Sequence, residues 1–339
     1  MPRYSYFPRA LRIYRLTQQI PMFNLLATTV GQQDFNRALV KKASREPANQ
    51  ELTTYGFITA YPRRKLTLAD REDPTLEDHL DDTPPEMARF LENGRFVILA
   101  ARKVKRNLPG SAIRKLVEAK VAEIEDQQDR KVYKKEKDQI KDEVIQKALP
   151  GSLTTDELTF AMIDTLLGYI YIDTGSATRA EDLLSTLREA LGSLPVRPIQ
   201  VKLPVAMTMT HWAKTGELPN GLRMLDAAMF EDINEKSSKA AIAGVDMDTD
   251  EARAHLDSGK SVTKLFMAWE DQLIFMLDEK LTLKKILFAD ILQEAAEEEG
   301  GEDMHGQLDA SYIIQLRTLG EFIPALLEGL GGEEIPQGL

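Results

Sequence analysis

Asp164 and Asp173 come closest, by residue type and position, to a pair of catalytic carboxylates. Each ends a predicted strand, in ELTFAMID and in GYIYID, and two neighbouring carboxylates could hold a metal ion for phosphodiester cleavage. Aspartates at strand ends are also common turn residues, and no motif adds a third acid, a lysine or a histidine. A metal-dependent DNA-processing enzyme therefore stays an alternative, and the sequence favours a protein that is not an enzyme.

The segment SGKSVT at 258–263 contains the last three residues of a phosphate-binding loop. That loop needs a glycine where this chain has Ala254, and it follows a strand, whereas the residues before Lys260 predict a helix. Lys260 is better interpreted as the polar start of a strand, so the motif does not indicate a nucleotide site.

The segment DMDTDE at 246–251 imitates the start of a calcium-binding loop, with aspartates at alternate positions. Such a loop needs glycine at its sixth position and a bidentate glutamate at its twelfth, but this chain has Glu251 and Asp257 there. A helix N-terminus capped by Asp248 or Thr249 accounts for the same residues.

Cysteine is absent, and none of the four histidines lies at ligand spacing from another. Disulfides, thiolate nucleophiles and cysteine-based zinc sites are thereby excluded, and the composition is typical of the reducing cytoplasm. The sequence predicts no metal or other cofactor. No apolar stretch is long enough to span a membrane, so no membrane partner is expected.

The segment RKVYKKEKDQIKDEVIQ at 130–146 concentrates Lys and Arg in a chain whose formal net charge is −11. The charge is unevenly divided: it is +8 over residues 1–65, −6 over 66–101, +5 over 102–147 and −18 over 148–339. A local excess of cations attracts phosphate even when the whole chain is acidic. The alternative is a solvated helix face with Lys and Glu paired one turn apart, but pairing alone would leave no positive excess.

Two helices, or one broken helix, are predicted around this segment, between two copies of the tetrapeptide LPGS at 108–111 and 149–152. Pro and Gly interrupt the preceding element, and Ser can cap a following helix. Apolar residues recur at helical spacing within 113–124 and 140–149, but they form only a thin stripe. A thin stripe buries little surface per residue, so this helical unit is expected to project from the body.

The rest of the chain predicts an α+β body with mainly antiparallel sheets. Helices are expected at 178–194 and 319–332, and acidic loops at 70–86 and 293–303. Strands are expected at 11–17, 51–61, 94–103, 158–164, 168–173, 260–288 (as two or three strands) and 310–318.

Several long blocks then follow one another in a characteristic order. They are AARKVKRNLP, EAKVAEIEDQQDRKVYKKEKDQIKDEV, RAEDLLSTLREALGSLPV, MTHWAKTG, and GKSVTKL with a Trp four residues on. In this order they closely resemble the RdgC family of recombination-associated proteins. The resemblance runs from about Ala100 to Leu292, resumes in ALLEGLGGE, and includes IYRL at 13–16.

This resemblance implies a fold, an assembly and a function. Members of the family are non-enzymatic, bind double-stranded DNA with little sequence preference, associate with the bacterial nucleoid in the cytoplasm, and restrain RecA-type recombinase. Each subunit is curved, with a helical tip and a base, and two subunits close head-to-head and tail-to-tail into a ring around DNA. By the resemblance, residues 1–101, 156–198 and 258–339 form the body, 102–155 the tip and 199–257 the base.

The resemblance also implies which residues bind DNA and which join the subunits. Lys115 and Lys135 are basic here without an assigned family counterpart and are included with the cations that match the family pattern. The expected DNA-binding residues are Arg15, Arg102, Lys103, Arg106, Arg114, Lys115, Lys120, Arg130, Lys131, Lys134, Lys135, Lys137, Lys141, Lys260 and Lys264. The expected apolar contacts between two tips are Leu149, Leu153 and Leu158.

The chain departs from the family pattern at several places. Residues 17–95 are longer than usual and match poorly, and Leu153 stands where relatives can carry an aromatic residue. Gly244 and Val245 replace a basic-polar pair, which weakens the expectation of a DNA contact there. A protein-interaction module that inhibits recombinase by direct contact stays open as a further alternative.

Overall fold

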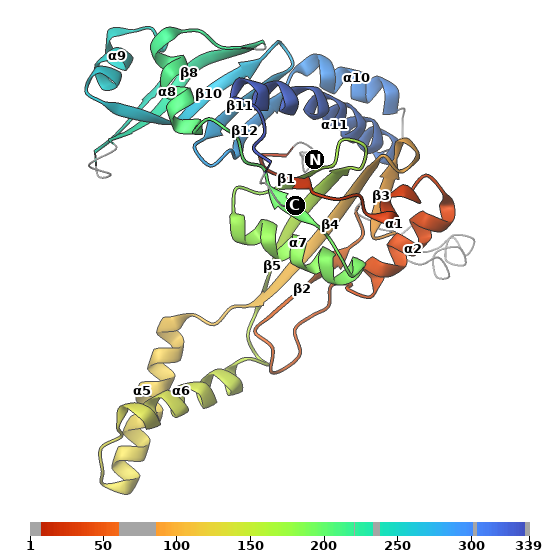
Figure 1. Ribbon diagram of the computed structural model, residues 1–339. Coiled ribbons are helices and arrows are strands. Elements are labelled where there is room, and N and C mark those ends of the chain that lie inside the picture. The colour runs from red at the N-terminus through yellow and green to blue at the C-terminus, as the bar shows by residue number, and fades with distance from the viewer. Residues whose placement is uncertain (1–7, 61–85, 220, 233–237, 301–303, 336–339) are drawn as a thin grey trace.

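The computed structural model describes residues 8–60, 86–219, 221–232, 238–300 and 304–335 (Figure 1). The expected acidic loop at 70–86 lies outside these residues, apart from Glu86. The described part has an elongated body from which one pair of helices extends (Figure 1). Among its helices, none is both long and apolar enough to cross a membrane.

Twelve strands of the described residues form one sheet, in which all pairings between strands are antiparallel. The expected α+β class with a large antiparallel sheet is therefore confirmed. Outside the main path, β3 (Ala88–Leu91) pairs with β4, and β7 (Val196–Pro198) pairs with β1. The main path runs through β2 (Thr53–Ile58), β4 (Phe96–Arg106), β5 (Thr154–Asp164), β6 (Tyr169–Asp173), β1 (Ala10–Leu16), β12 (Leu283–Phe288), β11 (Leu273–Asp278), β10 (Lys260–Trp269), β8 (Leu222–Asp232) and β9 (Lys239–Ala243).

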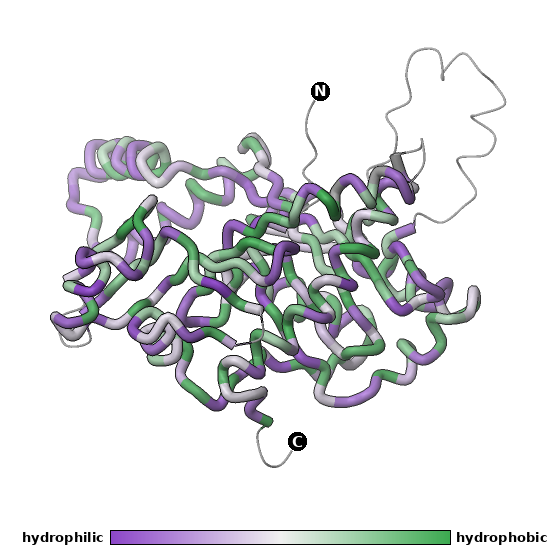
Figure 2. The backbone as a smooth tube through the Cα atoms, turned by 90° about the horizontal axis from the view of Figure 1, so that it is seen from above, coloured by the Kyte–Doolittle hydropathy of each residue, from purple (hydrophilic) through white to green (hydrophobic). Residues whose placement is uncertain are grey.

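Helices of the body lie on both faces of this sheet, whereas α5 (Gly110–Gln128) and α6 (Lys134–Ala148) extend away from it (Figure 1). The helices of the body are α1 (Pro21–Asn24), α2 (Thr29–Val40), the short 3-10 helix η1 (Glu92–Gly94), α7 (Ala177–Leu191), α8 (Val205–Thr215), α9 (Asp250–Asp257), α10 (Asp290–Gly300) and α11 (Met304–Gly329). The most hydrophobic stretches lie in the middle of the body (Figure 2).

The start of β4 shows why the central strands read as continuous apolar runs. Phe96 and Ile98 belong to the core cluster that also contains residues of α8 and α11, whereas Val97 and Leu99 belong to the cluster that contains residues of α2 and α7. Successive side chains of a strand point to opposite faces, so a strand covered on both faces must be apolar at every position. The run FVILAA, at 96–101, is therefore buried throughout.

The strand expected at 310–318 is wrong, because these residues lie inside α11. Leu308, Tyr312, Leu316 and Leu319 are buried at helical spacing. One turn further on, the Phe322 ring lies 4.8 Å from that of Phe275 on β11. The Tyr-Ile-Ile sequence favours a strand by propensity, but packing of a whole helix against the sheet outweighs that weak preference.

Two further expectations need correction. Residues 293–300, expected as an acidic loop, belong to α10. Ser111 caps no helix, because α5 already begins at Gly110 with Pro109 at its N-cap, and Ser152 precedes strand β5. By contrast, α9 begins after Thr249 and β10 begins at Lys260, as predicted.

The helices α5 and α6, called the helical hairpin below, continue strand β4 and lead back into strand β5 (Figure 1). Their small core contains Val121, Val132 and Ile140, with Val117, Ile124 and Val144 packed against it. At the far turn, Arg130 donates to both carboxylate oxygens of Glu136, at 2.7 and 2.6 Å, and Glu125 accepts from the Val132 amide at 2.9 Å. These bonds fix the turn, so the hairpin presents its charges in a defined arrangement.

Candidate nucleic-acid interface

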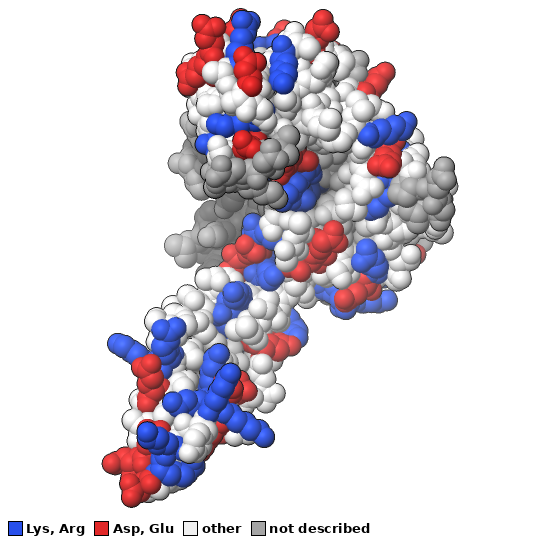
Figure 3. All heavy atoms as spheres, turned by 60° about the vertical axis from the view of Figure 1, so that its left-hand side comes forward, with Lys and Arg blue, Asp and Glu red and all other residues white. Residues whose placement is uncertain are grey.

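Lys and Arg side chains gather along the helical hairpin, with acidic side chains at its far end (Figure 3). Lys134, Lys137 and Lys141 follow one another on α6 at intervals of three and four residues. Residues at this spacing share one face of a helix, so the three ammonium groups lie in a row. All three side chains are exposed.

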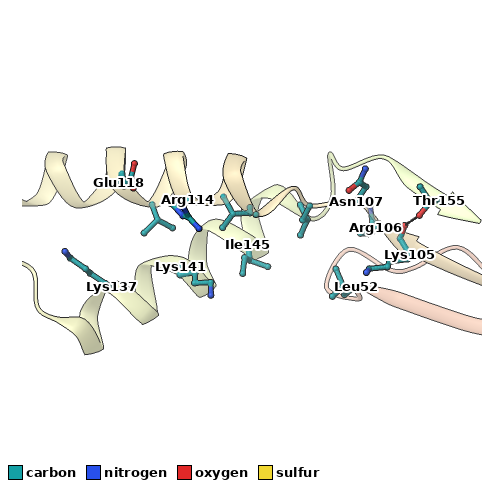
Figure 4. A pocket seen from close by; sticks show the side chains of 14 residues that line it. Leu52, Lys105, Arg106, Asn107, Arg114, Glu118, Lys137, Lys141, Ile145 and Thr155 are labelled. Carbon is teal, nitrogen blue, oxygen red and sulfur yellow. Dashed lines mark hydrogen bonds between the residues drawn. The ribbon is translucent and has the colours of Figure 1, made fainter. Parts of the chain in front are cut away.

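An open groove lies between the two helices and the ends of β4 and β5, with a volume of about 900 Å³. Arg114 comes from α5, Lys137 and Lys141 come from α6, and Lys105 comes from the end of β4 (Figure 4). These four exposed cations, with Glu118 as the acidic residue among the lining residues, define the basic groove. Within the described residues, none of the four is in an ion pair.

The opposite flank of the hairpin differs in charge. A second hollow there is lined by Lys120 and Lys147, which are balanced by Glu123 and Glu143. Lys120 contacts Glu123 at 2.8 Å, and this bond lowers the pKa of Glu123. Of the two flanks, the groove side therefore has the larger excess of cations, and a phosphate backbone could be held there by several of them at once.

Five of the predicted DNA-binding residues contact carboxylates in this structure; one is Arg15, 3.8 Å from Glu333, and the other four are Lys120, Arg130, Arg102 and Lys103. Lys120 and Arg130 have the partners given above, and the bond from Arg130 lowers the pKa of Glu136. On β4, Arg102 contacts Glu46 at 3.0 Å and Asp156 at 3.3 Å, and Lys103 contacts Asp182 at 2.7 Å. Their charge is largely compensated locally, so they contribute less to attraction of phosphate than the basic groove does.

Arg106 and Arg15, both predicted to bind DNA, make contacts that join separate segments of the chain. Arg106 is 8% exposed and donates to the Leu149 carbonyl at 2.7 Å and to the Pro47 carbonyl at 2.8 Å. Arg15 donates to the Leu167 carbonyl at 2.6 Å and stacks over the Tyr169 ring, 4.5 Å from its centroid. The Arg106 guanidinium is therefore taken up by backbone carbonyls, whereas the Arg15 side chain stays 33% exposed.

The remaining predicted cations fall in two places. Lys115, Lys131 and Lys135 are exposed on the hairpin outside the basic groove lining. Lys260 and Lys264 lie on β10, in the half of the sheet remote from the hairpin (Figure 1). The structure thus does not bring all fifteen predicted residues to one site.

Lys105 is not among the predicted DNA-binding residues, although the alternation of buried and exposed residues in β4 indicates that its side chain is exposed. In the sequence RKVKR at 102–106, the buried Val104 and Arg106 alternate with the more exposed Lys103 and Lys105. Strand alternation from the apolar Val104 therefore places Lys105 on the open face and Arg106 on the closed one.

The three leucines expected between two tips differ in exposure. Leu149 is 5% exposed and therefore buried within its own subunit, whereas Leu153 is 81% and Leu158 48% exposed. Of the three, Leu153 presents the largest free apolar surface.

Asp164 and Asp173 are not a carboxylate pair. Asp164 pairs with Tyr169, the first residue of β6, whereas Asp173 is the last residue of β6. The two carboxylates therefore lie at opposite ends of the β5–β6 strand pair. Asp164 is fully buried, contacts Arg95 at 3.1 Å and accepts from the amides of Leu166 and Leu167. No group of three metal-binding side chains occurs among the described residues.

Burial raises the pKa of Asp173, although the amides of Arg9 and Ala10 donate to its carboxylate. When a carboxyl has a higher pKa in the folded than in the unfolded state, the folded protein becomes less stable as the pH rises from the unfolded to the folded value. Asp173→Asn should therefore stabilise the protein slightly at pH 7, and the gain should vanish below the unfolded pKa of about 3.9. Urea unfolding across this pH range measures the effect, and a gain that persists at the lowest pH would contradict it.

Comparison with known proteins gives a consistent result. The family model described as "Putative exonuclease, RdgC" matches residues 85–333. Two relatives named "Recombination-associated protein RdgC", from Pseudomonas aeruginosa PAO1 and Pseudomonas syringae pv. tomato DC3000, are each 44% identical to this chain. The first alignment covers 98% of this chain and 99% of the relative, and the second covers 97% and 98%.

Proposed function

Because this chain belongs to the RdgC family, we propose that it binds double-stranded DNA without sequence preference and thereby limits the access of RecA-type recombinase. The observation that carries the proposal is the basic groove, with Lys105, Arg114, Lys137 and Lys141 exposed around Glu118. Lys and Arg side chains on phosphate supply affinity without reading bases.

The proposed assembly is a ring-shaped homodimer in the nucleoid of the bacterial cytoplasm. In it, the helical hairpin is the tip, residues 199–257 form the base, and Leu153 and Leu158 join two tips. Encirclement would direct the basic groove to DNA, while the acidic remainder of the chain, which carries −18 over residues 148–339, faces away from it. Binding would then delay escape from circular DNA by topology as well as by charge.

The word exonuclease in the description of the family model raises a second candidate, a metal-dependent enzyme. The curated relatives are named for recombination, not for an enzymatic activity. The separation of Asp164 and Asp173 on opposite ends of β5–β6 argues against the one carboxylate pair that the sequence offers. We therefore propose a function that depends on binding and not on cleavage.

Fluorescence anisotropy of a labelled random-sequence duplex, titrated with protein across a salt series, tests the proposal. We expect tight binding at low salt and a logarithmic affinity that falls linearly with the logarithm of salt concentration, by about 0.9 for each phosphate contact. Duplexes of different sequence should bind alike. Absence of binding at low salt, or strand scission that requires magnesium, would overturn the proposal.

A further inference from the structure

Five apolar side chains also line the basic groove and are called its floor below; the proposed DNA contact gives them no role. These side chains are Leu52, just before β2, Leu108, just after β4, Ile113 and Val117 on α5, and Ile145 on α6. Leu52 is 47% exposed, and Leu108, Val117 and Ile145 are half-buried. Apolar surface left open to water at the bottom of a cavity marks a binding site more often than scattered surface leucines do.

Nucleic acid does not account for this floor. A duplex presents sugar and phosphate on its outside, which the cations around the groove can contact while the floor stays uncovered. A single strand could lower its bases into the groove, but base binding relies on stacking against aromatic rings. The residues that line the groove include no aromatic side chain, and the exposed Tyr133 is not among them.

We propose that the basic groove binds an acidic peptide segment of a partner protein that carries large apolar side chains. The apolar side chains would pack on Leu52, Val117 and Ile145, while the carboxylates would pair with the surrounding cations. Helices that lay an apolar face into a groove, and acidic segments held by clustered cations, are both common modes of peptide recognition. The volume of about 900 Å³ accommodates several side chains and lies near the top of the range for ligand pockets.

Charge complementarity is what favours an acidic partner. The hollow on the opposite flank also offers an exposed leucine, Leu116, which is 51% exposed. There, however, Lys120 and Lys147 are balanced by Glu123 and Glu143. Both flanks thus offer apolar surface, but of the two only the groove side combines it with a positive excess.

This proposal goes beyond the proposed DNA binding and implies competition with it. A peptide in the groove and a phosphate backbone across it would both use Lys137 and Lys141. An acidic partner would therefore displace the protein from DNA, which provides a way to relieve its hold on recombination.

The test uses a labelled synthetic peptide of Glu and Leu with leucines three and four residues apart, and a second peptide with Ser at each Leu position. Anisotropy with the full-length protein should show the Leu-containing peptide binding at least about tenfold more tightly, because only it covers the floor. Leu52→Ser should weaken that binding about fivefold, whereas Leu116→Ser, the matched change on the other flank, should leave it unaltered. Neither substitution should change duplex affinity.

Equal binding of the two peptides, or no effect of Leu52→Ser, would overturn the proposal, since the floor would then have no part. A single-stranded oligonucleotide whose binding depends on Leu52 would overturn it too, by assigning the groove to nucleic acid. If the protein binds the Leu-containing peptide through Leu52 but binds no duplex, the proposed function fails while this inference stands.

Discussion

Replacing Arg114, Lys137 and Lys141 together with Gln should lower the affinity for duplex DNA about a hundredfold at low salt. The three cations line the same side of the hairpin, are exposed, and form no ion pair within the described residues. Each would release counterions from one phosphate, so the plot of log affinity against log salt should become shallower by about 2 to 3. All duplex sequences should be affected alike.

The matched control removes three charges from the same two helices on their other sides. Lys115→Gln, Lys120→Gln and Lys147→Gln change the net charge by the same amount, but Lys120 is paired with Glu123, and Lys147 lies in the balanced hollow. This variant should keep most of its affinity and its salt slope. Equal losses in the two triple variants would mean that overall charge, and not the basic groove, determines binding.

Arg106→Ala should lower the free energy of unfolding by about 3 kcal/mol, the second large effect that we expect. The guanidinium is buried and joins two segments far apart in sequence, through the carbonyls of Leu149 and Pro47. The segment around Pro47 is itself held by Arg45, which donates to both oxygens of Glu51 and, with the Ala48 amide, lowers the pKa of Glu51 to about 2. Removing Arg106 leaves the Pro47 carbonyl without this donor and opens a cavity where the hairpin meets the body.

Arg102→Ala on the same strand is the control, because its partly exposed ion pairs should contribute less than about 1 kcal/mol. Urea unfolding gives both values. In conditions where Arg106→Ala is fully folded, its salt slope for duplex binding should equal that of the unchanged protein, because the buried guanidinium donates to two backbone carbonyls. A shallower slope with unchanged stability would restore Arg106 as a DNA contact.

The sequence by itself determined the features that depend on neighbouring residues. Helical spacing within 113–149 predicted two helices, or one broken helix, with a thin apolar stripe, and the structure has two helices there, α5 and α6. Alternation and apolar runs located β1, β2, β4 and the three strands β10 to β12. The concentration of Lys and Arg at 102–147 follows from the order of the residues alone, because charges can be counted along a chain whatever its fold.

Only the tertiary structure decided which of these residues are available to a ligand. Lys103 and Lys105 share the more exposed side of β4, yet Lys103 pairs with Asp182, 79 residues further along the chain, whereas Lys105 lines the basic groove with no ion pair within the described residues. Asp164 and Asp173 end consecutive strands, but the antiparallel register of β5 and β6 places them at opposite ends of the pair. Strand register, ion pairing and burial arise from contacts between distant residues, and a sequence pattern records only the near ones.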